Sequence, residues 1–150
     1  MSSHEAERRI AERVEAGAYT MTLSMPGLPQ LNAAANRHWR IRAREARHWR
    51  EVVSAGVKAS AEGLPESPIQ TCALLCERRS STEPDDDNLV FSFKQIVDAF
   101  IELGIVVDDS PEHVGYRRYH WSRVPKKQGM IEVTVVDISD AFEGVSLVPD

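Results

Sequence analysis

The stretch IQTCALLCERRSSTEPDDDNLVFSFKQIVDAFIELG (69–104) contains the central strand and helix of the expected fold. Residues 69–78 form a short apolar run, which predicts a largely buried strand. Residues 80–87 are a polar connection, and in residues 88–103 apolar side chains recur with the period of an α-helix. Gly104 is well placed to end that helix, because glycine adopts the backbone conformation of a helix C-terminus without strain.

The segments on either side of this unit supply one more helix and three more strands. Residues 18–25 alternate and predict a strand, and residues 39–60 predict a long helix. Residues 114–124 and 130–138 predict two further strands, joined by a hairpin turn at 126–129. The order of strand, helix, strand, helix, strand, strand is typical of an α+β fold. We expect a two-layer sandwich, in which a four-stranded mixed sheet carries both main helices on one face.

The chain has 150 residues, a length that fits one domain. We expect an N-terminal helical extension over residues 1–17, one folded domain over 18–138 and a flexible tail over 139–150. No apolar run approaches the ~20 residues that cross a bilayer, and the charged start of the chain is not a signal peptide. A cytoplasmic protein without a membrane partner is expected, with Cys72 and Cys76 as reduced core residues.

Charge is distributed unevenly along the chain, although the formal net charge is −5. Residues 37–50 carry six arginines and one acidic residue, residues 117–127 carry five basic residues and no acidic one, and residues 83–109 are strongly acidic. Basic blocks of this kind can hold a polyanion through its phosphates. An ordinary solvated surface is the alternative for each block. The candidate DNA-binding residues are Arg37, His38, Arg40, Arg42, Arg44, Arg47 and Arg50 in the first block, and Arg117, Arg118, Arg123, Lys126 and Lys127 in the second.

Two acidic turns frame the second predicted helix. Residues 85–87 are three aspartates before it, and Asp108 and Asp109 follow it. Asp85 and Asp87 are two apart, so in an extended segment they point the same way, and the helix with its short return can bring Asp109 beside them. Carboxylate oxygens suit magnesium, which neutralises a phosphate and lowers the pKa of water. Taken alone, each turn is also explained as a helix cap or a solvated turn.

Lys94 is the cation expected beside this acidic cluster. If Asp87 opens the helix, seven steps of 100° bring Lys94 within ~20° of the same face. Asp98, four residues further on, continues that face. His113 is a minor candidate for a contact with the site. Trp39, Trp49 and Trp121 are expected in the core or at a dimer contact rather than against bases.

The segment DDDNLVFSFKQIVDAFIELGIVVDD (85–109) resembles the motif of the RusA family of Holliday junction resolvases. The matching residues are Asp85, Asp87, Asn88 and Leu89 at its start, and Lys94, Asp98, Ala99, Gly104, Asp108 and Asp109 in the rest. The resemblance covers roughly residues 18–138, including the loop LPQLN (28–32). One departure is the lysine: the family places it four residues after the second aspartate, whereas Lys94 follows Asp87 by seven, as if three residues within VFSF were inserted.

The resemblance implies a magnesium-dependent endonuclease, with manganese as an alternative ion, that resolves four-way DNA junctions by paired nicks in recombination and repair. Asp85, Asp87 and Asp109 would bind the metal and activate water, with Asp108 as a helper, and Lys94 would stabilise charge on the phosphate. The family acts as a homodimer, which presents two sites to two symmetry-related strands. Two alternatives stay open: a branched-DNA-binding protein that does not cut, and a metal-dependent phosphohydrolase of small phosphates.

Overall fold

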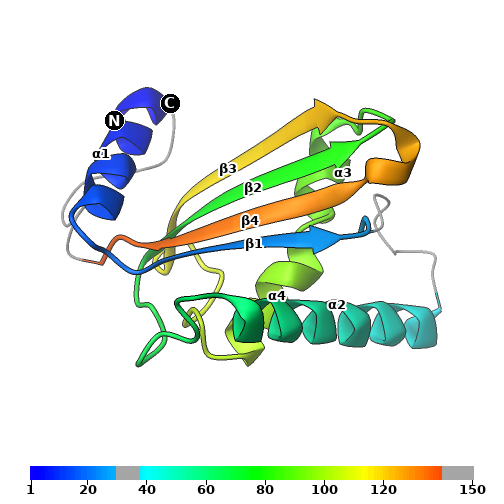
Figure 1. The fold of residues 1–150 in the computed structure, drawn as a ribbon, viewed down its shortest axis with the longest axis horizontal. Coiled ribbons are helices and arrows are strands. Elements are labelled where there is room, and N and C mark those ends of the chain that lie inside the picture. Colours follow the sequence, from blue (N-terminus) through cyan, green and yellow to red (C-terminus); the bar gives the residue numbers. More distant parts are fainter. Residues whose placement is uncertain (30–37, 140–150) are drawn as a thin grey trace.

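The computed structural model describes residues 1–29 and 38–139, so Arg37 and the tail from residue 140 lie outside the described residues. Four strands form one mixed sheet in the order β1-β4-β2-β3 (Figure 1). Strand β4 is antiparallel to β1 and β2, whereas β2 and β3 are parallel. The strands are β1 (Thr20–Pro26), β2 (Cys72–Ser80), β3 (Val114–Arg123) and β4 (Met130–Asp137).

The main helices pack on one face of this sheet, which confirms the expected α+β architecture. Helix α2 (Trp39–Ala59) lies against β1 and against α4 (Lys94–Glu102), and the short helix α3 (Asp86–Phe91) lies beside β3. The core between helices and sheet is continuous across all of these elements. It includes Val53 of α2, Phe100 of α4, Leu74 of β2 and Ile131 of β4, each of them fully buried.

The N-terminal extension forms helix α1 (Ser3–Glu15), which packs on the opposite face of the sheet. Its side chains Ala6 and Ile10 are buried against residues of β2, β3 and β4. Because an apolar side chain at nearly full burial contributes about 1.5–3 kcal/mol relative to its exposed state, α1 is a packed part of the fold. Figure 1 shows it at one end of the sheet, and no other described helix packs on that face.

The connection after β3 differs from the expected hairpin. A 3-10 turn, η2 (Lys126–Gln128), leads the chain past the end of β2, and β4 then pairs with β1 and β2 instead of with β3. The apolar side chains Ile131, Val133 and Val135 of β4 are fully buried, which suits an interior strand. Strand β3 is rich in exposed charge, which suits an edge because charged edge strands resist pairing with other chains. The hairpin prediction at 126–129 is therefore wrong.

The helix expected over residues 88–103 is in fact two helices with a break at Ser92 and Phe93. The Ser92 hydroxyl donates a hydrogen bond to the Leu89 carbonyl at 2.7 Å. Serine hydroxyls compete in this way with the backbone bonds of a helix. The break turns Phe93 into the core, where it is 1% exposed. Gly104 follows α4 with φ of 77°, as expected of a residue that ends a helix.

Helix α2 has the predicted bounds, but its buried face is shorter than predicted. Its buried residues are Trp49, Val53 and Val57. Trp39, Ala43 and Ala46, which continue the helical spacing of these residues towards the start of α2, are exposed. In Figure 1 the first turns of α2 run past the end of β1, so no sheet lies there to cover them. The periodicity of this segment is real, but its first half has no sheet to pack against.

Cys72 and Cys76 are buried free thiols, which confirms their expected place in the core. Burial raises the pKa of each thiol to about 12. Both side chains therefore stay neutral over the physiological pH range. Separately, within residues 1–29 and 38–139 no helix combines the length and apolar character that crossing a membrane requires.

Candidate active site

A cavity of about 280 Å³ lies where α3, α4 and β3 meet. Asp87 of α3, Lys94 of α4, Asp109 of the turn before β3 and Arg117 of β3 all line it. The remaining lining residues, mostly apolar, are Val90, Phe91, Phe93, Val97 and Tyr119. Two carboxylates and two cations from four separate segments thus share one small cavity with a largely apolar wall.

Asp85 does not line this cavity and acts as the N-cap of α3. One of its carboxylate oxygens accepts a hydrogen bond from the Asn88 backbone N–H at 2.9 Å, and the other accepts from the Asn88 side-chain amide at 3.3 Å. Asp108 also bonds locally, because its carboxylate accepts from the Asp109 backbone N–H at 2.8 Å. The structure therefore brings Asp87 and Asp109 to one cavity and leaves Asp85 and Asp108 in local turns.

The metal-ligating capacity of the cavity rests on two carboxylates. Among the described residues, no three side chains of His, Cys, Asp or Glu form a group that could hold a metal ion. Magnesium does not require such a group, since it commonly binds through one or two carboxylates and completes its shell with water and substrate phosphate. The donor set of Asp87 and Asp109 fits that mode of binding.

Lys94 lines the cavity, but the predicted register with Asp87 on one continuous helix does not explain its position. The argument from a continuous helix fails because the chain breaks between α3 and α4. Lys94 is instead the first residue of α4, and its ammonium lies 3.8 Å from the Asp98 carboxylate, with both side chains about half exposed. The segment VFSF (90–93), where the spacing departs from the motif, spans the end of α3 and this break. An exposed ion pair of this kind is weak, so the ammonium is free to move.

Arg117 is the residue whose place the sequence did not predict. Its guanidinium donates a hydrogen bond to the backbone carbonyl of Asp109, and it lies near the side chain of Tyr119, which also lines the cavity. Burial raises the pKa of the Tyr119 hydroxyl, and the nearby Arg117 partly offsets that rise. Arg117 thus ties the acidic turn to β3 and adds a fixed cation to the cavity. The alternation along β3 carried this signal, because Arg117 shares a face with Tyr119 and Trp121.

The rest of the second basic block does not form one surface with Arg117. Arg118, its neighbour in β3, points to the opposite face and pairs with Glu7 of α1. Arg123 lies against the Trp121 ring, with its guanidinium carbon 5.1 Å from the ring centroid. Lys126 and Lys127 are exposed in η2, at the end of the sheet.

The first basic block lies on α2, and much of it is free of counterions. Arg50 pairs with Glu102 at 2.8 Å. Within the described parts of the chain, the other four arginines of α2 form no ion pair with a carboxylate; they are Arg40, Arg42, Arg44 and Arg47, and all are exposed. His38 caps the helix, because its Nδ1 accepts a hydrogen bond from the Arg40 backbone N–H at 3.1 Å. This cationic surface of α2 is the larger candidate for phosphate contact.

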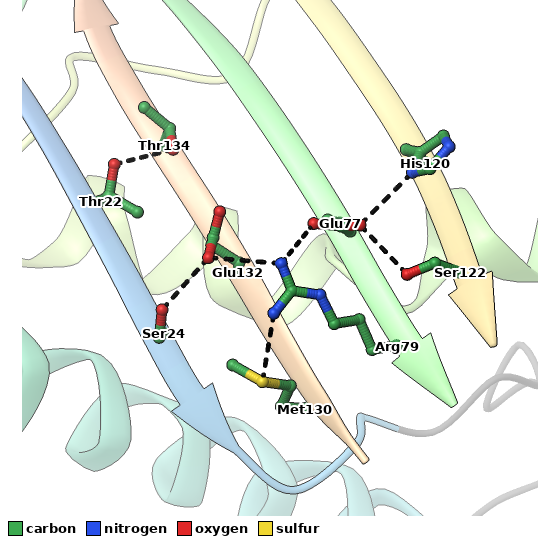
Figure 2. A network of polar contacts seen from close by, with 9 residues as sticks. All are labelled: Thr22, Ser24, Glu77, Arg79, His120, Ser122, Met130, Glu132 and Thr134. Carbon is green, nitrogen blue, oxygen red and sulfur yellow. Dashed lines mark hydrogen bonds and ion pairs between the residues drawn. The ribbon is translucent and has the colours of Figure 1, made fainter. Parts of the chain in front are cut away.

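The open face of the sheet carries a second group of charges, which Figure 2 shows. Arg79 lies between two carboxylates, 2.9 Å from Glu77 and 3.7 Å from Glu132. Burial acts to raise the pKa of Glu77, but hydrogen bonds from Arg79 and Ser122 outweigh it, so the pKa is lowered. Because Arg79 bridges the two carboxylates, they stabilise the sheet and do not form a second metal site.

The remaining aromatic candidates have separate environments. Trp49 is buried, and the Trp121 indole N–H donates to the Ser80 hydroxyl at 2.9 Å beside the core. Trp39 is 61% exposed, so its assignment to the core is wrong. His113 donates through Nδ1 to the Gln70 carbonyl at 2.7 Å and does not line the cavity.

Comparison with known proteins leaves the family open. No protein-family model matches the sequence, and no curated protein matches it. The likeness to RusA-type resolvases therefore rests on the spacing of residues 85–109. Of the motif's residues, the structure places Asp87, Lys94 and Asp109 at one cavity.

Proposed function

We propose that this protein is a magnesium-dependent endonuclease that cuts branched DNA and acts as a homodimer. The observation that supports it most is the shared cavity, where Asp87, Asp109, Lys94 and Arg117 converge from separate segments. Three of these four residues belong to the motif that resembles the RusA family. Two carboxylates that face two cations suit a phosphodiester, because the carboxylates can hold a divalent ion while the cations bind phosphate oxygens.

In this proposal each residue has a separate task. Asp87 and Asp109 hold the ion, and Asp85 caps α3 and so fixes the direction of Asp87. Magnesium at this position would neutralise phosphate charge and make water more acidic. Arg117 offers a planar fork of donors to the scissile phosphate, and Lys94 adds a mobile charge from the rim. The cavity is open to solvent, and Asp87, Lys94 and Arg117 are exposed there, so a phosphate could approach them from outside.

The cationic surface of α2 serves DNA binding in the proposal. Arginines bind phosphates without reading sequence, which suits a protein that selects branched structure. A homodimer would place two such surfaces and two cavities on a four-way junction, and a twofold arrangement matches the twofold pairing of strands to be cut. The homodimer is carried over from the family resemblance.

The direct test is cleavage of a four-way junction, with a linear duplex of the same sequence as the control substrate. We expect paired nicks in magnesium and none in EDTA. Asp87→Asn and Asp109→Asn should abolish nicking while junction binding in EDTA stays at the wild-type level. Asp86→Asn is the matched control, since Asp86 is exposed in the same helical turn and does not line the cavity. If Asp87→Asn cuts at the wild-type rate, the cavity is not the active site.

A second candidate function is binding of branched DNA without cleavage. The engagement of Asp85 in the cap favours it, because only two carboxylates remain at the cavity. Such a protein would bind junctions with a steep salt dependence and would produce no nicks at any concentration of magnesium or manganese. The same junction assay therefore separates the two functions.

A further inference from the structure

Trp39 occupies an unusual position for a tryptophan, because it is 61% exposed at the start of α2. The guanidinium carbon of Arg40 lies 5.3 Å from the centroid of its ring, and the His38 ring lies 5.6 Å away at a tilt of 31°. The His38 ring is held in turn by its bond to the Arg40 backbone. The indole is thus flanked by two polar neighbours while most of its surface faces solvent.

The same tripeptide occurs again ten residues later, and the comparison shows that packing does not explain Trp39. The sequence His-Trp-Arg stands at 38–40 and at 48–50. Trp49 is 4% exposed and belongs to the main core, and Arg50 is neutralised by Glu102. Ten residues of helix correspond to ~15 Å, which places Trp39 beyond the part of α2 that lies under the sheet.

The charge around Trp39 indicates what it contacts. Arg40, Arg42, Arg44 and Arg47 surround the first three turns of α2 and, among the described residues, none has a carboxylate partner. A second copy related by a twofold axis through this surface would bring its own arginine-rich α2 here, which is unfavourable. A nucleic acid matches both the charge and the exposed indole of this surface, because arginines bind its phosphates and an indole stacks on its bases.

We propose that the first three turns of α2 bind unpaired nucleotides, with the Trp39 indole stacked on a base and the neighbouring arginines on its phosphates. A base inside a duplex does not expose its flat face, so this surface selects single-stranded segments or opened branch points. The inference deepens the proposed function and rests on it for the identity of the natural substrate. Stacking itself requires no metal and no cleavage.

The test is equilibrium binding in EDTA. The fluorescence anisotropy of a labelled oligodeoxythymidylate, and of a labelled duplex of equal length, reports the binding. Trp39→Ala should weaken single-strand binding by about 5-fold to 100-fold, the range typical of loss of one stacking partner. Duplex binding should change by less than about 2-fold, and Trp39→Phe should keep most of the single-strand affinity. Ile41→Ala is the matched control, because Ile41 is an exposed apolar residue of the same turns that cannot stack on a base.

Two results would overturn the stacking site. One is an unchanged single-strand affinity in Trp39→Ala, or an equal loss for single strand and duplex. The other is a shift of Trp39→Ala from dimer to monomer in sedimentation velocity, which would make this surface a contact between two copies. Failure of the proposed function would give a different result. The wild-type protein would not nick a junction, but Trp39→Ala would still weaken single-strand binding, and the stacking site would stand.

Discussion

If the protein is the nuclease proposed above, replacing Arg117 should impair cleavage far more than replacing Lys94, although only Lys94 belongs to the motif that resembles the RusA family. The two variants to compare are Arg117→Ala and Lys94→Ala, with Arg117→Lys as an intermediate. Both residues line the cavity, but they are held differently. Arg117 is held by its hydrogen bond to the Asp109 backbone carbonyl, whereas Lys94 has only the exposed carboxylate of Asp98 at 3.8 Å.

The expected magnitudes follow from that difference. Loss of one fixed donor at a site of developing charge lowers kcat by roughly 10²–10³-fold, and we expect this of Arg117→Ala. An ammonium that is 59% exposed contributes at most about 1 kcal/mol, or about fivefold in rate, because solvent screens it and the long side chain must be ordered. Arg117→Lys should fall between the two, since lysine keeps the charge but lacks the planar fork.

The assay is single-turnover nicking of a four-way junction with protein in excess. Junction binding in EDTA is measured alongside and should change by less than about threefold in either alanine variant, because the larger cationic surface lies on α2. Thermal unfolding shows whether Arg117→Ala has merely loosened the turn at Asp109. A loss in Lys94→Ala that exceeds the loss in Arg117→Ala would refute the reasoning and show that the shifted lysine keeps the family's role.

Three further predictions concern stability and reactivity. Burial acts to raise the pKa of Glu77, but hydrogen bonds from its arginine and serine neighbours lower it overall. The ionised carboxylate therefore stabilises the folded protein at pH values above the ordinary glutamate pKa of about 4.3. This stabilisation is lost as the pH falls through the lowered pKa. Urea unfolding between pH 7 and pH 3 should show a smaller loss of stability in Glu77→Gln than in wild type. The thiols of Cys72 and Cys76, with pKa raised to about 12 by burial, should not react with a thiol reagent at pH 8 until the protein is unfolded. Ile10→Ala should lower the free energy of unfolding by about 2–5 kcal/mol, and an unchanged urea midpoint would mean that α1 is only loosely attached.

Periodicity was enough to predict where helices and strands lie, because each element buries one side against the core. It could not predict which strands pair. The expected hairpin after β3 follows the general preference of consecutive strands for pairing. Strand β4 departs from it and lies between β1 and β2, where Ile131, Val133 and Val135 are buried on one face and Val136 is buried on the other. Apolar residues on both faces at the end of this strand, Val135 and Val136, were the signal for an interior position.

The hydrophobic periodicity also could not predict the break between α3 and α4. Leu89, Phe93, Ile96 and Phe100 fit one helical face, so a continuous helix was the natural interpretation. All four are buried in the structure, and the break only changes how Phe93 arrives there. A single hydroxyl bond from Ser92 interrupts the helix, and a local competition of this kind does not alter the hydrophobic pattern.

The candidate site was predicted in part, and the misses share one cause. Asp87 and Asp109 line one cavity because α4 and its short return bring the two turns to the same part of the fold. Asp85 had two interpretations in the sequence, ligand and N-cap, and the structure shows the cap. Arg117 was expected only as a DNA contact, since a basic block gives no hint of which side chain turns inward. Residue type and spacing predict the chemistry of a site, whereas competing local hydrogen bonds decide which member of a cluster is available.

The same competition explains how a chain of net charge −5 can present a surface for a polyanion. Several acidic side chains form ion pairs within the chain: Glu102 with Arg50, Asp98 with Lys94, and Glu77 with Arg79. A carboxylate that is paired in this way is nearly neutral at a distance, and at physiological salt charges interact over only ~8 Å. The unpaired arginines in the first turns of α2 therefore present a local positive potential that the formal charge of the whole chain does not cancel. In the proposed function, DNA binding depends on which arginines lack a carboxylate partner, and among the described residues Arg40, Arg42, Arg44 and Arg47 of α2 have none in an ion pair.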